Sequence, residues 1–129
     1  MTAVLIVDDQ LELLAITGAF LAENGYTVSW APTAVAALKL LTTHRTDVLL
    51  TDIIMPGGID GFELARRAKV NHPDLKIIYC TGKSNLEPEQ IGHTYGPLLK
   101  KPYTQSRLLA VLEHVTGGDY QTVPALPGD

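Results

Sequence analysis

Residues 51–61 of the chain read TDIIMPGGIDG, and they directly follow an apolar run at residues 48–50. A short run without polar interruption predicts a strand that is buried on both faces. The Pro-Gly-Gly turn ends this strand, and Asp60 can then cap a new helix at residues 61–70. We therefore expect Asp52 at the carboxyl end of a central strand, which is the edge of an open α/β sheet where ligands bind.

Strands and helices alternate along the rest of the chain. Short apolar runs predict strands at residues 3–7, 26–30, 47–51, 75–80 and 97–100. Helical spacing predicts three more helices, each with an apolar stripe. The stripe of the first helix is Leu11, Leu14, Ala15, Phe20 and Leu21, and that of the second is Val35, Ala36, Leu38, Leu40 and Leu41. The last helix is expected at residues 103–115, with the stripe Leu108, Leu109, Val111 and Leu112. Residues 83–96 hold few apolar anchors, so at most a short, weak fourth helix is expected there.

This alternation predicts a single α/β domain of three layers, a parallel sheet of five strands with helices on both faces. A chain of 129 residues is long enough to bury a core of its own. We expect the domain to cover residues 1–116 and to be followed by a flexible Pro- and Gly-containing tail at residues 117–129.

The composition argues against several classes of partner. The formal net charge of −4 gives no basic surface for nucleic acid or for an anionic membrane. No apolar run approaches the roughly 20 residues that span a bilayer, and the N-terminus lacks the pattern of a signal peptide. The single cysteine, Cys80, cannot form an internal disulfide, so we expect a cytoplasmic protein.

Polar residues follow the predicted strands: Asp8 and Asp9 after the first, Asp52 after the third, Thr81 after the fourth and Lys101 after the fifth. If the strand order is 2-1-3-4-5, the three carboxylates meet at the switch point of the sheet. Carboxylates that close cannot all stay ionised without a counter-charge, and hard oxygen ligands suit Mg²⁺. A metal ion, a lysine and a hydroxyl donor around a carboxylate are suited to phosphoryl transfer onto that carboxylate.

From about Thr2 to Thr116 the chain resembles a receiver domain of a two-component response regulator, with a CheY-like, flavodoxin-like fold and strand order 2-1-3-4-5. The resemblance is carried by four motifs: Leu5-Ile6-Val7-Asp8-Asp9, Asp52-Ile53-Ile54-Met55-Pro56 with Asp60-Gly61, Thr81-Gly82, and Lys101-Pro102. Because the family's lysine directly precedes the proline, Lys101 is chosen over Lys100, which we expect to be a solvated side chain.

The resemblance implies that Asp52 accepts a phosphoryl group from a sensor histidine kinase or a phosphotransfer protein. It implies that Mg²⁺ is held by Asp9, Asp52 and the main-chain carbonyl of Ile54, with Asp8 often acting through water. Thr81 and Lys101 would bind the phosphoryl oxygens, and the bond before Pro102 would be cis, for which the sequence itself gives only a permissive X-Pro.

The same resemblance implies how the protein works after phosphorylation. Ile54 and Lys83 lie where family members tune the access of hydrolytic water. The protein would be a single-domain response regulator, a monomer or weak dimer, that signals to a downstream protein through the face between strands four and five. It would be no enzyme beyond its own phosphoryl transfer and slow autodephosphorylation.

Three departures from the family pattern are present. Residues 57–59 make the loop between Met-Pro and Asp-Gly one residue longer than usual, and the stretch from Thr81 to Lys101 is shorter than usual. Leu98 occupies a position where an aromatic residue is common, so a full aromatic switch cannot operate. We expect instead that residues 83–96 are mobile and become ordered on activation.

Three alternatives stay open. A phosphohydrolase with an aspartyl nucleophile usually has an acid/base Asp two residues later, where this chain has Ile54. A receiver-like scaffold that acts without phosphorylation has no need of an intact set of acidic residues, threonine and lysine. The chain could also be the receiver segment of a hybrid histidine kinase. A flavin site is disfavoured because the loop after the first strand is acidic and offers no phosphate cradle.

Overall fold

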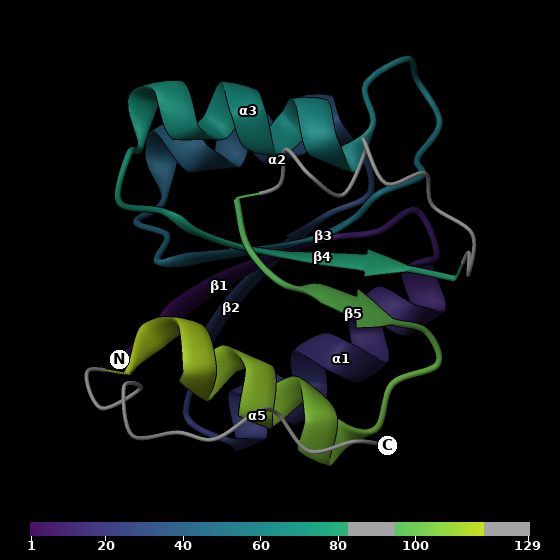
Figure 1. Cartoon of the computed structure of the whole chain (residues 1–129), viewed down its shortest axis with the longest axis vertical. Coiled ribbons are helices and arrows are strands. Elements are labelled where there is room, and N and C mark those ends of the chain that lie inside the picture. The colour runs from purple at the N-terminus through teal and green to yellow at the C-terminus, as the bar shows by residue number, and fades with distance from the viewer. Residues whose placement is uncertain (83–94, 118–129) are drawn as a thin grey trace.

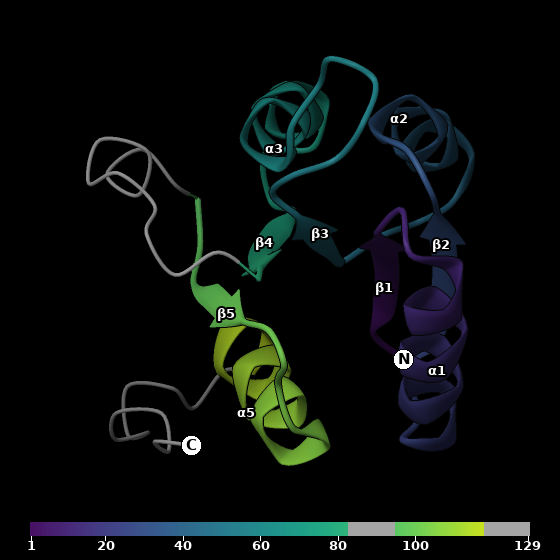
Figure 2. The same cartoon turned by 90° about the vertical axis from the view of Figure 1, so that its right-hand side faces the viewer.

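The structure, a computed structural model, describes residues 1–82 and 95–117. These residues form the predicted five-stranded parallel sheet, in the order β2-β1-β3-β4-β5 that the family resemblance implies (Figure 1). The elements are β1 (Ala3–Val7), α1 (Leu11–Glu23), β2 (Thr27–Ala31), α2 (Ala34–Thr43), β3 (Val48–Asp52), α3 (Gly61–Asn71), β4 (Lys76–Thr81), β5 (Leu98–Lys100) and α5 (Gln105–Thr116). Helices α2 and α3 cover one face of the sheet and α1 and α5 cover the other (Figure 2).

Two apolar cores lie on the two faces of the sheet because side chains alternate along each strand. On β1, Leu5 belongs to the core under α2 and α3, and Ile6 belongs to the core under α1 and α5. β3 divides in the same way between Leu49 and Leu50. All five residues of β1 are buried, as expected for a strand that has neighbours on both edges and helices on both faces.

Three helices begin at a side chain that accepts a hydrogen bond from the first turn. The Thr33 hydroxyl accepts from the Ala36 amide at 3.1 Å, and the Asp60 carboxylate accepts from the Glu63 amide at 2.8 Å. Thr104 caps α5 in the same way. The predicted cap at Asp60 is confirmed, and it fixes where the chain turns after the loop that follows Asp52.

An exposed group of ion pairs lies on the outer side of α3. We call it the α3 ion-pair cluster: Glu63, Arg66 and Arg67. The Glu63 carboxylate lies 2.6 Å from a guanidinium nitrogen of Arg66 and 2.7 Å from one of Arg67. These hydrogen bonds lower the pKa of Glu63 from 4.5 to about 2. One carboxylate at the protein surface is therefore shared by two exposed cations.

The predicted apolar stripe of α1 is wrong at two positions. Leu11 is 67% exposed and Ala15 is also exposed, whereas Thr17 and Gly18 are buried. The outer side of α1 is itself largely apolar, so periodicity could not indicate which side faces the sheet. Gly18 is buried because the Trp30 ring lies directly over it, leaving no room for a Cβ atom.

The stripe predicted for α2 is also wrong in part. Val35 is 53% exposed, and the buried positions are Ala34, Ala37 and Leu41. The helix turns two alanines toward the sheet because small side chains allow the closest approach of a helix to the strands. The predicted element ends differ from the observed ones by one or two residues, within the variation of any such boundary.

Residues 83–94 and 118–129 lie outside the described residues. The predictions of a weak, mobile fourth helix and of a flexible tail fall almost entirely on them. Among the residues that the structure describes, none of the helices has the length and apolar character needed to cross a membrane.

Candidate functional site

Three carboxylates meet at the carboxyl ends of two adjacent strands. β1 and β3 pair in parallel, with Val7 opposite Thr51, so Asp8 and Asp52 leave the sheet side by side. Carboxylate oxygens of Asp8, Asp9 and Asp52 all lie within 4.8 Å of one another. Asp8 is buried, Asp52 is half-buried and Asp9 is exposed, which leaves the group open to solvent on one side.

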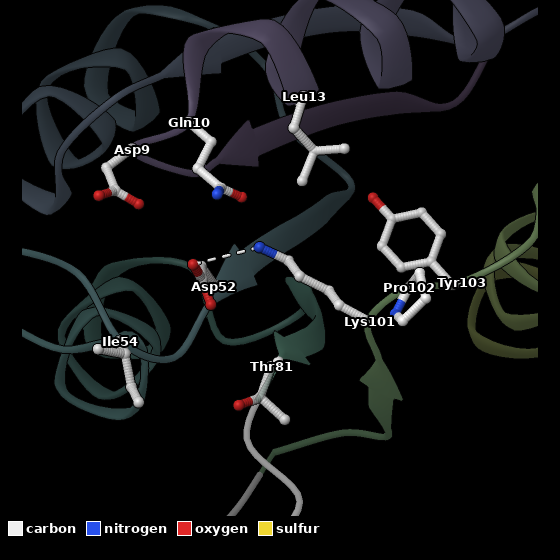
Figure 3. Close-up of a pocket in the computed structure, with 10 residues that line it drawn as sticks. Asp9, Gln10, Leu13, Asp52, Ile54, Thr81, Lys101, Pro102 and Tyr103 are labelled. Carbon is white, nitrogen blue, oxygen red and sulfur yellow. Dashed lines mark hydrogen bonds and ion pairs between the residues drawn. The ribbon is translucent and has the colours of Figure 1, made fainter.

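Lys101, which directly follows the edge strand β5, supplies a positive charge to this group. Its ammonium lies 2.7 Å from the Asp8 carboxylate and 3.3 Å from that of Asp52, and Figure 3 shows its side chain reaching across the pocket. We call Asp8, Asp9, Asp52 and Lys101 the acidic site cluster. Since three carboxylates face one ammonium, the cluster has two negative charges in excess when all groups are ionised.

The pKa values reflect this crowding. Burial raises the pKa of Asp52, the Asp8 charge raises it further, and the neighbouring Lys101 opposes both without cancelling them. Burial alone would lower the pKa of Lys101, but its hydrogen bond to Asp8 and the charge of Asp52 outweigh burial and raise it. The lysine is therefore held as a cation, and Asp52 lies where an additional positive charge would stabilise its ionised form.

The backbone around the cluster is closely packed. The Gln10 amide donates to the Asp8 carboxylate at 2.9 Å, which fixes the carboxylate at the end of β1. Gly61 packs against the carbonyl oxygen of Asp52, so that a Cβ atom here would collide with it. The Lys101 amide donates to the Thr81 carbonyl at 2.8 Å, and the Lys101–Pro102 peptide bond is cis, as the resemblance implies.

A pocket with a volume of about 650 Å³ opens above the cluster. It is lined by Asp9, Gln10, Leu13, Asp52, Ile54, Thr81, Gly82, Lys101, Pro102 and Tyr103 (Figure 3). This space is large enough for a metal ion and a phosphoryl group, with room left for part of a phosphodonor. Ile54 forms an apolar part of the rim and is 48% exposed.

The structure thus brings Asp8, Asp9, Asp52, Thr81 and Lys101 together as predicted. The roles predicted for these residues in metal binding, phosphorylation and phosphoryl binding stay predictions, as does metal binding by the Ile54 carbonyl. Lys83 lies outside the described residues. Lys100 is exposed, in agreement with the sequence interpretation, and Cys80 is buried.

Sequence reasoning missed three residues that line or support this pocket. Gln10 was not singled out, although its place directly after the acidic pair was a usable signal. Leu13 lies on the pocket wall although it was left out of the predicted α1 stripe. Tyr103 was placed only at the start of the predicted last helix, and its hydroxyl lies 3.3 Å from the Thr17 hydroxyl of α1. That contact spans 86 residues of sequence and has no local signal.

Known proteins share this arrangement of elements. The family model described as "Response regulator receiver domain" matches residues 4–113. The response regulator MprA of Mycobacterium ulcerans is 33% identical over 109 residues, which are 83% of this chain and 47% of MprA. The nitrogen assimilation regulatory protein NtrX of Azorhizobium caulinodans is 28% identical over 85% of this chain and 25% of its own length. The chain therefore spans about half of MprA and a quarter of NtrX.

Solved structures agree with this assignment. The chemotaxis protein CheY4 of Vibrio cholerae matches with a TM-score of 0.81 at 29% identity, over 89% of this chain and 98% of CheY4. The response regulator TrrA of Thermotoga maritima, in complex with Mg²⁺ and BeF, matches with a TM-score of 0.80 at 27% identity, over 89% and 99% of the two chains. The chain belongs to the response regulator receiver domain family, whose members are signalling modules of two-component systems.

Proposed function

We propose that this receiver domain is a phosphoacceptor in a two-component phosphorelay and that Asp52 takes the phosphoryl group. The observation that carries the proposal is the acidic site cluster, in which the Asp52 carboxylate lies at the floor of an open pocket beside a held lysine. The donor would be the phosphohistidine of a sensor histidine kinase or of a phosphotransfer protein, and the protein would work in the cytoplasm.

The donor set of the cluster fits Mg²⁺. Three carboxylates whose oxygens lie within 4.8 Å offer more negative charge than Lys101 balances. Magnesium takes one or two carboxylates and several waters or phosphate oxygens, and the open side of the pocket allows such ligands. Asp9, Asp52 and the Ile54 carbonyl would hold the ion directly and Asp8 would hold it through a water molecule; the bound ion would neutralise charge on the transferred group. TrrA, which shares the fold, was crystallised with Mg²⁺ and BeF.

In the transfer step, a carboxylate oxygen of Asp52 forms a bond to phosphorus while the phosphorus–nitrogen bond of the donor histidine breaks. The imidazole leaves with the electron pair of that bond. The Lys101 ammonium, now 2.7 Å from Asp8, turns toward a phosphoryl oxygen, and the Thr81 hydroxyl donates to another. These groups position the phosphoryl group and stabilise its charge, which is most of what phosphoryl transfer requires.

Phosphorylation would add roughly two negative charges at Asp52 and draw the ends of β4 and β5 toward them. The face formed by β4, β5 and the segment between them would then contact a downstream protein. The protein would act as no enzyme apart from its own phosphorylation and slow loss of phosphate.

A scaffold that acts without phosphorylation stays the second candidate, because it needs only the fold. The third candidate is a receiver segment of a hybrid histidine kinase.

Mass spectrometry after incubation with acetyl phosphate tests the proposal. The wild-type protein is expected to gain one phosphoryl group in the presence of Mg²⁺ and none in chelator. Peptide mapping after borohydride trapping is expected to place that group on Asp52. Equal labelling of Asp52→Asn, or full labelling in chelator, contradicts the proposal, and the absence of any labelling of the wild type favours the scaffold.

A further inference from the structure

Tyr79 of β4 connects the site to the interior of the domain. Its side chain is fully buried although it carries a hydroxyl. It lies two positions before Thr81, so both side chains lie on the same face of β4. Its ring packs against Phe62 with the ring centroids 5.2 Å apart. Phe62 directly follows Gly61, which packs against the Asp52 carbonyl. Tyr79 thus lies close in the chain to Thr81 at the end of β4 and packs against α3, whose first residue contacts the Asp52 carbonyl.

Tyr79 also holds the segment that leads into β5. Its hydroxyl accepts a hydrogen bond from the Tyr95 amide at 3.1 Å, and its own amide donates to the Pro97 carbonyl at 2.9 Å. Between them, Gly96 lies so close to the Ile77 carbonyl that a Cβ atom has no room. One buried residue therefore anchors two of the three positions that precede β5.

The far end of this connection is at the surface. The Tyr95 side chain is 48% exposed. The Lys69 ammonium of α3 lies 5.9 Å from the centroid of its ring, within the range of a cation–π interaction. Lys69 also donates to the Pro73 and Leu75 carbonyls just before β4. A shift of Tyr95 would thus change an exposed aromatic and cationic surface beside the end of α3.

We propose that Tyr79 is a positioning residue that couples the Asp52 site to the exposed surface at Tyr95. The proposal rests on the proposed phosphorylation of Asp52. When Thr81 is drawn toward the phosphoryl group, the end of β4 moves and the Tyr79 hydroxyl moves with it. The Tyr95 amide follows because the hydroxyl accepts its hydrogen, and the surface ring changes its position relative to Lys69.

The test is the variant Tyr79→Phe, which keeps the ring against Phe62 and removes only the hydroxyl. Amide hydrogen exchange is measured by NMR with and without acetyl phosphate and Mg²⁺. Without phosphorylation, exchange at Tyr95 is expected to be about fivefold faster than in the wild type, the effect of losing one neutral hydrogen bond. On phosphorylation, the wild type is expected to change at both Thr81 and Tyr95, and the variant at Thr81 alone.

A matched control is Tyr26→Phe, which removes a tyrosine hydroxyl beside β2 and is expected to keep the coupled change at Tyr95. Phosphorylation of Asp52 is measured by mass in every sample. If Asp52 is phosphorylated but Tyr95 does not respond in the wild type, or responds equally in Tyr79→Phe, the coupling is overturned and the proposed function stands. If Asp52 takes up no phosphoryl group, the proposed function fails and the coupling fails with it.

Discussion

The acidic site cluster and the α3 ion-pair cluster combine the same kinds of charged groups in opposite ways. In the α3 ion-pair cluster one partly exposed carboxylate is shared by two guanidinium groups, and its pKa falls to about 2. In the acidic site cluster three carboxylates face one ammonium, and burial raises the pKa of Asp52. The carboxylate charge of the α3 ion-pair cluster is balanced without any ligand, whereas the acidic site cluster keeps an excess of negative charge.

The difference shows how a charged group can be assigned to stability or to binding. Exposed pairs contribute little to stability because water and salt screen them and long side chains lose entropy. A partly buried group of like charges opposes folding, and a bound cation relieves that cost. An excess of one sign in a buried place, rather than the number of charges, is therefore the better indication of a ligand site.

Replacement of Lys101 by Met is expected to have the largest effect. It removes the cation that would bind a phosphoryl oxygen, so the rate of phosphorylation by acetyl phosphate should fall about 100-fold. The affinity for Mg²⁺, measured by titration calorimetry, should rise, because the ammonium no longer competes for Asp8 and Asp52. The control is Lys100→Met, an exposed neighbour outside the pocket, which should change neither quantity. If both the phosphorylation rate and the affinity for Mg²⁺ fall in Lys101→Met, the Lys101 ammonium does not compete with Mg²⁺ for Asp8 and Asp52.

Replacement of Ile54 by Asn tests the open side of the same cluster. Ile54 is apolar and cannot orient a water molecule, so we expect a long-lived phosphoprotein. The amide of Asn can hold water near the phosphoryl group, and loss of phosphate should become about tenfold faster. The decay is followed by mass after removal of the phosphodonor. Ile54→Val keeps the apolar rim and should retain the slow decay; an unchanged or slower rate in Ile54→Asn counts against this role.

Replacement of Asp52 by Asn should stabilise the metal-free protein. It removes one of the three crowded carboxylates, while Lys101 keeps its contact with Asp8 at 2.7 Å. We expect an increase of about 1 kcal/mol in the free energy of unfolding, measured with urea at pH 7 in chelator. Excess Mg²⁺ should reduce this difference, because only the wild type retains the full set of ligands. A clear loss of stability of Asp52→Asn in chelator would show that the three carboxylates do not repel one another enough to oppose folding in the absence of a ligand.

Replacement of Glu63 by Gln should have the smallest effect. Because its folded pKa is lowered to about 2 from 4.5, Glu63 contributes stability that is present above pH 4.5 and is lost as the pH falls toward 2. The stability of Glu63→Gln should therefore fall less steeply than that of the wild type as the pH decreases from 4.5 toward 2. In high salt, which screens the ion pairs, the two proteins should have similar stability. Thermal melts between pH 2 and pH 6 in low and high salt measure it. A large loss at neutral pH would mean that the exposed ion pairs matter more than their screening implies.

The residues at the strand ends could be predicted because they depend on local signals, whereas the strand order was implied only by the family resemblance. Apolar runs that stop at Asp8, Asp52 and Thr81 are visible without any tertiary information, and so is a cap such as Asp60. Which side of α1 faces the sheet could not be predicted, because apolar residues lie on both sides of that helix.

The role of Tyr79 could not be predicted for a different reason. In the sequence it is one more apolar residue of a strand, and Leu98 is simply a missing aromatic side chain. The structure places Tyr79 directly beside Leu98 in the pairing of β4 with β5, so an aromatic ring lies next to that position after all. Only the register between strands, which depends on contacts far apart in the chain, brings the two together.

The contact between Lys101 and Asp8 also has a consequence for synthesis of the protein. The two residues are 93 positions apart, so a ribosome releases the carboxylates long before the lysine that pairs with them. A nascent chain that ends before β5 holds its acidic residues without their internal cation, and β5 itself has only three residues. Competence to take up a phosphoryl group should therefore appear only after Lys101 has emerged. Nascent chains that lack Lys101 would then not compete for phosphoryl groups with chains that contain it.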